Sequence, residues 1–188
     1  MSEYRAQKEL KPKVEDIARE LLDEDKLASV LDFLEFLKSN KLTPRWYTSN
    51  SWVVKYKNKT VCKIKLNWMP RSSDKGNFWG IYQAHFTRED WFENYDSYIT
   101  DDGLKAFIWD HINPPHGCSQ QGGTVRCKGW PDVTILGKTY KAVCGCHSLV
   151  VKNPDGKTLE YAKEFVLVIK NYIADLAAKG KYQGESHA

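Results

Sequence analysis

The sequence predicts a single α+β domain, in which an antiparallel sheet is covered by N-terminal and C-terminal helices. Apolar residues recur every three or four positions near both ends of the chain, and they alternate with polar residues between these ends. The order of predicted elements is helices, strands, helices, strands and a last helix, which is typical of α+β domains. A chain of 188 residues, 41% of them hydrophobic, is long enough for one real core. We expect a helical part over 1–45, the sheet and closing helix over 46–180, and a loose tail over 181–188.

Two amphipathic helices are predicted over residues 12–22 and 24–39. Their apolar positions are spaced by three and four, as one buried face of a helix requires. Asp23, Glu24 and Asp25 place acidic groups at the positive N-terminal end of the second helix. Asn40 and Pro44 then end it.

Residues 46–68 alternate as two strands around a polar turn, which predicts a β-hairpin. The apolar sets of the two strands coincide if Tyr56 lies opposite Cys62, and the turn is then the three residues 58–60. This register predicts an inward set and an outward set. The inward set is Trp52, Val54, Tyr56, Cys62, Ile64 and Leu66, and the outward set is Lys55, Lys57, Lys63 and Lys65.

Further elements follow along the chain. A third strand is predicted over 77–86, and because both of its faces are partly apolar, it is covered on both faces or borders a pocket. Capping signals predict a short helix after Thr87 and another from Thr100 to Ile112. A second hairpin over 133–143 turns at Gly137-Lys138. The last elements are a strand over 148–151 and a long helix that begins after Pro154 and ends before Gly180.

Aromatic residues are concentrated between Trp46 and Trp109. Their number is greater than one face of a sheet can bury. We therefore predict an aromatic-lined pocket near the third strand that binds a small, partly apolar ligand, with Trp79, His85 and Trp91 as ligand-binding residues. In this pocket the rings supply contact area and His85 a polar anchor. The alternative is an ordinary core whose tyrosine and tryptophan polar groups reach the surface.

Four of the five cysteines lie within 29 residues, with His116 and His147 beside them. The candidate metal ligands are Cys118, Cys127, Cys144 and Cys146. Thiolates from a loop and a strand end can hold a structural zinc ion. Reduced structural thiols, a redox pair or a regulatory disulfide explain the same residues, because the spacing differs from a double C-x2-C motif. The fifth, Cys62, is explained as a small buried hydrophobe.

The chain also resembles a family of small uncharacterised bacterial proteins. The resemblance is carried by residues 46–66, by residues 133–144 and by Asn153-Pro154-Asp155, and it covers most of residues 25–175. It implies a helical N-terminal segment, a lysine-rich hairpin, a cysteine-bearing Gly-rich loop and a closing helix. Members of the family have loop cysteines spaced more closely than Cys118 and Cys127. The resemblance implies no activity.

These observations favour a binding or accessory protein over two alternatives. The first alternative is a small enzyme that uses a histidine with a nearby acid. Its candidate groups are His85, His111, His116, His147, Glu89, Asp90, Asp101, Asp102 and Asp110. The second alternative is a nucleic-acid binder that uses the lysine-rich hairpin face. We do not expect a nucleic-acid partner, because the predicted lysines and aromatic rings lie on opposite faces of the hairpin.

Charge and hydropathy limit the partners and the cellular location that we expect for the protein. The net charge is +4, but residues 46–80 carry seven basic and one acidic side chains, whereas residues 81–115 carry two basic and seven acidic ones. Such alternation argues against a uniformly positive surface. The longest apolar run, 165–169, is too short for a membrane span, and the first residues lack the features of a secretory signal. We therefore expect a cytoplasmic protein with no membrane partner, and the sequence makes no prediction of its oligomeric state.

Overall fold

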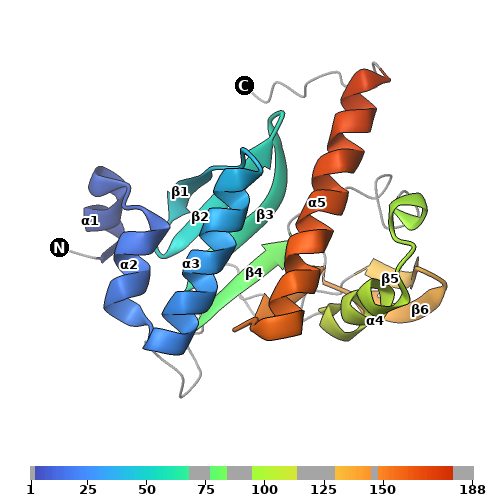
Figure 1. The fold of residues 1–188 in the computed structure, drawn as a ribbon, viewed down its shortest axis with the longest axis horizontal. Helices are drawn as coiled ribbons and strands as arrows, with labels where there is room; N and C mark the ends of the chain where they lie inside the picture. The colour runs from blue at the N-terminus through green and yellow to red at the C-terminus, as the bar shows by residue number, and fades with distance from the viewer. Residues whose placement is uncertain (1–2, 68–76, 84–94, 114–129, 145–147, 180–188) are drawn as a thin grey trace.

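The computed structural model describes residues 3–67, 77–83, 95–113, 130–144 and 148–179 and shows an α+β fold (Figure 1). Five antiparallel strands form one sheet in the order β1-β2-β3-β4-β7, and β5 pairs with β6 in a separate hairpin. The helices are α1 (Glu3–Leu10), α2 (Val14–Leu21), α3 (Glu24–Ser39), α4 (Asp102–His111) and α5 (Gly156–Ala178). The strands are β1 (Pro44–Thr48), β2 (Ser51–Tyr56), β3 (Lys59–Leu66), β4 (Trp79–Gln83), β5 (Trp130–Ile135), β6 (Lys138–Val143) and β7 (Leu149–Lys152).

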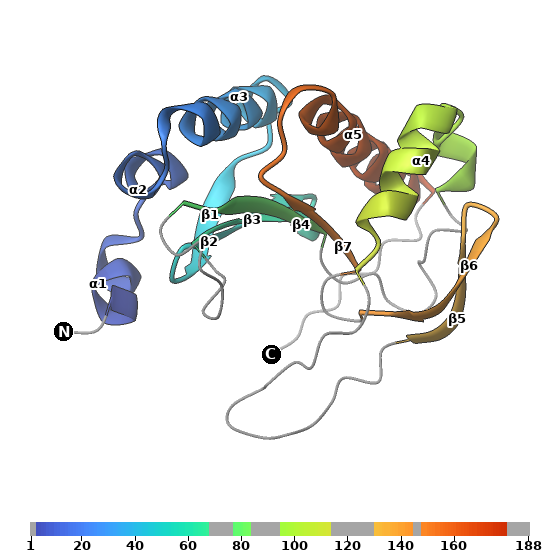
Figure 2. The ribbon, with the colours of Figure 1, turned by 90° about the horizontal axis from the view of Figure 1, so that it is seen from below.

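The main core lies between the five-stranded sheet and the helices α3 and α5. Figure 2 shows both helices on the same side of the sheet, with α4 next to α5 and with α1 and α2 near the β1 end. Trp79 of β4 contacts Phe33 of α3, with their ring centroids 6.0 Å apart. Phe165 of α5 is fully buried in the same core. Burial of these large side chains is the main force that holds the helices on the sheet.

The N-terminal prediction was correct for two helices and incomplete for the third. α2 and α3 lie within the predicted ranges, but α1 was not predicted, because its sequence is mostly polar. Gln7 holds α1 against the sheet: its Nε2 donates to Oδ1 of Asn50 at 2.6 Å, and its Oε1 accepts from the Asn50 backbone N–H at 2.9 Å. Because this contact is made by polar groups, the spacing of apolar residues could not predict that α1 packs against the sheet.

The predicted register of the β2–β3 hairpin was wrong by two residues. Val54, not Tyr56, lies opposite Cys62, and the turn is the two residues Lys57 and Asn58, both with positive φ (45° and 65°). A two-residue turn alone would place Trp52 opposite a lysine. Between the pairs Val54–Cys62 and Lys55–Thr60, however, β3 contains an extra residue, which is a β-bulge. The bulge returns the two apolar sets to one face.

The predicted faces of the hairpin were correct for the inward set, but the predicted exposure of the outward set was wrong for two lysines. Five of the six inward residues are buried and Tyr56 is half-buried. Lys55 and Lys57 are exposed, but Lys63 and Lys65 are only 9% and 5% exposed. Their ammonium groups lie over the rings of Tyr47 (5.0 Å) and Tyr82 (4.5 Å). The prediction assumed that the second face of the sheet meets solvent, whereas this part of it is covered.

Strand β4 is covered on both faces, which is one of the two arrangements that its sequence predicted. All five of its residues are buried. Trp79 and Ile81 face the helices, whereas Gly80 and Tyr82 lie on the second face, opposite Lys65 and Lys63 of β3. A Cβ at Gly80 would lie 3.0 Å from the Tyr82 ring and 3.0 Å from the Val151 carbonyl oxygen. The ring of Tyr82 therefore occupies the space that a side chain at position 80 would need.

Asp23 is the N-cap of α3 and also contacts Asn77, two residues before β4. Its carboxylate accepts from the Lys26 backbone N–H at 3.1 Å and from Lys26 Nζ at 3.0 Å, and Asn77 donates to it as well. The hydrogen bonds from Asn77 and Lys26 lower the pKa of Asp23 from 3.8 to about 2. The charged form is thus favoured in the folded state.

This lowered pKa makes the stability of the protein depend on pH in an acidic window. The stabilisation from Asp23 is fully present above pH 3.8 and is lost as the pH falls toward 2. We expect wild type to lose more of its melting temperature between pH 5 and pH 2 than Asp23→Ala does, as followed by circular dichroism. The exposed carboxylate of Glu24, replaced by alanine, is the control. Equal pH dependence of wild type and Asp23→Ala would contradict this account of the cap.

The β5–β6 hairpin packs beside α4 (Figure 2). Trp109 Nε1 of α4 donates to the Ile135 carbonyl oxygen at 2.9 Å, and the Tyr140 hydroxyl donates to the Trp109 carbonyl oxygen at 3.1 Å. The predicted turn was displaced by one residue: Leu136 and Gly137 form it, with φ of 50° and 82°. Two consecutive positive φ values are those of a type I′ hairpin turn.

Candidate ligand-binding site

The predicted pocket residues fall partly outside the described structure. Trp79 is fully buried on the helix-facing side of β4, and its backbone N–H donates to Oδ1 of Asn153 at 2.9 Å. It lines neither of the two grooves described below. His85 and Trp91 lie outside the described residues. Trp79 is therefore placed as a core residue, and the pocket at the third strand stays a prediction.

The predicted zinc ligands also lie mostly outside the described residues. Cys118, Cys127 and Cys146 lie outside the described residues. Cys144 is 2% exposed, and its backbone N–H donates to the Asn113 carbonyl oxygen at 2.8 Å. Within the described ranges, no three His, Cys, Asp or Glu side chains are placed to share a metal ion. The zinc site stays a prediction. The Cys62 thiol is fully buried, as predicted for a small buried hydrophobe. Burial raises the pKa of this thiol.

A groove of about 300 Å³ lies between α4 and the first turns of α5. On α4 its lining follows the spacing of one helix face, and on α5 it comes from the first six residues of the helix. The lining residues are Gly103, Ala106, Phe107, Asp110 and His111 of α4 and Lys157, Thr158 and Tyr161 of α5. The groove therefore exists because two amphipathic helices, 45 residues or more apart in sequence, pack side by side.

Three rings form the apolar wall of this groove. The ring centroids of Phe107 and His111 are 4.4 Å apart, and those of Phe107 and Tyr161 are 5.7 Å apart. Gly103 allows the Tyr161 ring to approach α4, since a Cβ at position 103 would lie 2.0 Å from the Tyr161 hydroxyl oxygen. A flat molecule can stack against such a surface.

Polar groups stand around these rings. His111 Nδ1 lies 2.7 Å from the Phe107 carbonyl oxygen. Because a carbonyl can only accept, Nδ1 carries the proton, and the neutral ring keeps an acceptor at Nε2. The Lys157 ammonium lies 5.2 Å from the centre of the Tyr161 ring. Asp110 adds a carboxylate, and burial together with its negative charge raises the pKa of Tyr140. The groove thus offers an acceptor, a cation and an anion beside aromatic surface.

Local sequence signals fix both helices at this site. Oδ1 of Asp101 accepts from the Leu104 backbone N–H at 2.7 Å, and α4 therefore begins at Asp102, within the predicted range 100–112. α5 begins at Gly156, whose φ of 41° suits glycine, directly after its N-cap Asp155. These two starts place Gly103 against Tyr161 and set the position of His111 relative to Lys157.

Sequence reasoning found part of this site. His111 and Asp110 were among the candidates of the enzyme alternative, but Lys157 and Tyr161 were not singled out. The spacing 103, 106, 107, 110, 111 was a usable signal, because it marks a helix face of small, aromatic and polar residues. The sequence did not show that the first turns of α5 lie against that face.

Comparisons with known proteins give no match to a family model, to a curated protein or to a solved structure. None of the helices in the described ranges is both long and apolar enough to cross a membrane. The geometry of the groove is therefore the basis for the function proposed below.

Proposed function

We propose that the protein binds a small, flat, partly apolar ligand in the groove between α4 and α5. The gathering of the Phe107, His111 and Tyr161 rings with a histidine acceptor carries this proposal. A volume of about 300 Å³ suits a ligand of one or two rings. A hydroxyl or N–H group on the ligand would donate to Nε2 of His111, and the rings would supply the contact area.

Binding is favoured over catalysis by the way that His111 is held. A general base is commonly oriented by a carboxylate, which stabilises the imidazolium that forms when the base takes a proton. His111 is oriented by the neutral carbonyl of Phe107, and Asp110 is its direct neighbour in sequence, so the two side chains leave the helix about 100° apart. This arrangement supports a hydrogen-bonding role. The enzyme alternative is kept because Nε2 of His111 is a proton acceptor.

The test is a ligand screen by NMR with the full chain and small phenols and indoles as probes. We expect hits to shift the backbone amides of Gly103, Phe107, His111 and Tyr161. Tyr161→Leu should weaken binding about tenfold or more, because one wall of the groove is lost. Gly103→Ala should weaken it similarly, because the new Cβ forces the Tyr161 ring away.

Tyr47→Leu is the matched control for Tyr161→Leu. Tyr47 is 58% exposed and lies on the five-stranded sheet, so its loss should leave the affinity unchanged. A screen without hits, or an equal loss in both leucine variants, would contradict the proposed groove. Each hit is then tested for chemical conversion by the protein. Turnover that disappears in His111→Gln would replace the binding function with the enzyme alternative.

A further inference from the structure

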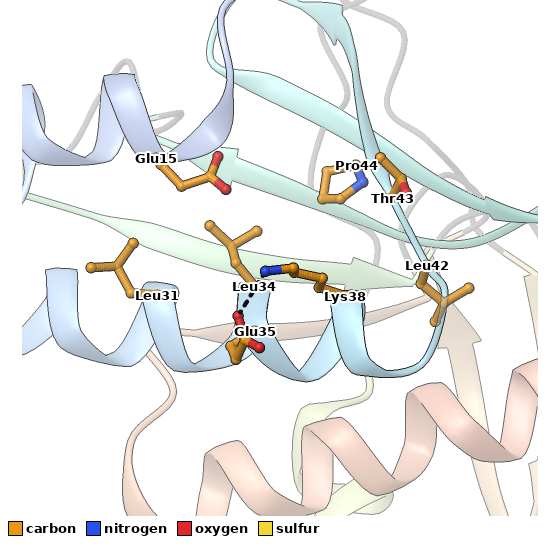
Figure 3. Close-up of a pocket in the computed structure, with 8 residues that line it drawn as sticks. All are labelled: Glu15, Leu31, Leu34, Glu35, Lys38, Leu42, Thr43 and Pro44. Atoms are coloured by element: carbon orange, nitrogen blue, oxygen red, sulfur yellow. Dashed lines mark ion pairs between the residues drawn. The ribbon is translucent and has the colours of Figure 1, made fainter.

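A second groove, of about 430 Å³, lies between α2, α3 and the segment that enters β1 (Figure 3). It is independent of the α4–α5 groove and is formed by the N-terminal part of the chain. Its apolar lining consists of Leu31, Leu34, Leu42 and Pro44, and its polar lining consists of Glu15, Glu35, Lys38 and Thr43. The groove is thus a strip of leucine side chains with charged groups along its sides.

The apolar lining follows from the helix packing. Leu31, Leu34, Glu35 and Lys38 recur at helical spacing on the face of α3 that is turned toward α2. Leu34 and Leu42 are 7% and 1% exposed, so they form a fixed floor, and Leu31 is half-buried. An aliphatic or aromatic group laid on this floor would be removed from water at little cost in reorganisation.

The charged residues beside this floor differ in whether they form an ion pair. Glu35 forms an ion pair with Lys38 at 3.8 Å, but both side chains are largely exposed (69% and 81%), which makes the pair weak. Glu15 is half-buried and projects from α2 toward the α3 side chains (Figure 3). Within the described part of the chain, Glu15 forms no ion pair. The groove therefore keeps one carboxylate that is available to a cation.

We propose that this groove binds an amphiphilic cation: an alkylammonium group attached to an aliphatic body. The ammonium pairs with Glu15 and the aliphatic body covers Leu31 and Leu34. A neutral molecule of the same shape would gain only the apolar contact, and an anionic one would face the charge of Glu15. The order of affinity is therefore cation, neutral molecule, anion.

The proposal is tested with hexylamine, hexanol and hexanoate, titrated into the protein and followed by the backbone amides of α2 and α3. Hexylamine should bind about tenfold more tightly than hexanol, and hexanoate more weakly than either. Glu15→Gln should lower the affinity for hexylamine to that for hexanol and leave the affinity for hexanol unchanged. Glu20→Gln, on an exposed position of the same helix, should change neither. An unchanged melting temperature of Glu15→Gln confirms that the variant is folded.

Three results would overturn the proposal: equal binding of hexylamine and hexanol, equal effects of Glu15→Gln and Glu20→Gln, or no binding of any probe. A lysine side chain of a peptide carries the same alkylammonium group as a free amine. Acetyl-leucyl-lysine amide is therefore titrated beside hexylamine. Tighter binding of the peptide identifies a peptide lysine as the source of the cation, and tighter binding of hexylamine identifies a free amine.

Discussion

Replacing Trp79 with alanine is expected to lower the free energy of unfolding by about 3–5 kcal/mol. Trp79 is fully buried on β4, between β3 and the edge strand β7, and its ring contacts Phe33 of α3. The substitution leaves a cavity at the contact between the sheet and the helix layer, and the strands around it cannot close the space. Urea unfolding followed by circular dichroism measures the change.

Trp46→Ala is the matched control, because Trp46 lies on the edge strand β1 and is only half-buried. Trp46→Ala should lower the free energy of unfolding clearly less than Trp79→Ala does. A third variant, Trp79→Phe, separates a core role from the ligand-binding role that the sequence predicted for Trp79. If Trp79→Phe keeps its stability but loses the affinity for ligands identified in the screen, Trp79 contacts a ligand. If Trp79→Ala unfolds at the urea concentration of wild type, the core assignment is wrong.

Replacing Gly80 with valine should also be strongly destabilising, by about 2 kcal/mol or more, because it overpacks a covered sheet face. A Cβ at this position would lie 3.0 Å from both the Tyr82 ring and the Val151 carbonyl oxygen. The oxygen belongs to the backbone of the neighbouring strand and cannot yield without disturbing the β4–β7 pairing. Gly80→Ala adds a single carbon and should cost less. Thermal and urea melts measure both.

A double-variant cycle with Tyr82→Leu tests which contact is responsible. Since the Tyr82 ring fills the space beside Gly80, part of the cost of Gly80→Val should disappear in the Tyr82→Leu background. The residual cost then reports the contact with the Val151 carbonyl oxygen. Strict additivity of the two substitutions would show that the ring does not occupy that space.

The helices that face the core could be predicted from the sequence, because their apolar spacing and capping residues agree. Asp23 and Asp101 are the N-caps of α3 and α4, and both belong to the acidic segments where the sequence predicted these helices to begin. The hairpin register was not predictable from alternation alone. A three-residue turn and a two-residue turn with a bulge both align Trp52 and Val54 with the apolar face of β3, and nothing in the residue pattern distinguishes them.

Burial of the second sheet face and the shape of the grooves depend on contacts between segments far apart in the chain. The spacing of Lys63 and Lys65 shows that they share a face, but it does not show that Tyr47 and Tyr82 cover their ammonium groups. His111 could be named as a candidate from its type. Its partner across the groove, Tyr161, could not be found, because helix packing brings residues 50 positions apart together.

The short helix α4 has neighbours on two sides, and this gives the β5–β6 hairpin a role beyond its own two strands. One side of α4 forms a wall of the α4–α5 groove, while Trp109 on another side donates to and accepts from the hairpin. Because α4 carries both the contacts with the hairpin and the rings of Phe107 and His111, a change that shifts the hairpin is expected to shift these rings as well. Substitutions in the β5–β6 hairpin are therefore expected to alter the shape of the α4–α5 groove without replacing any residue that lines it.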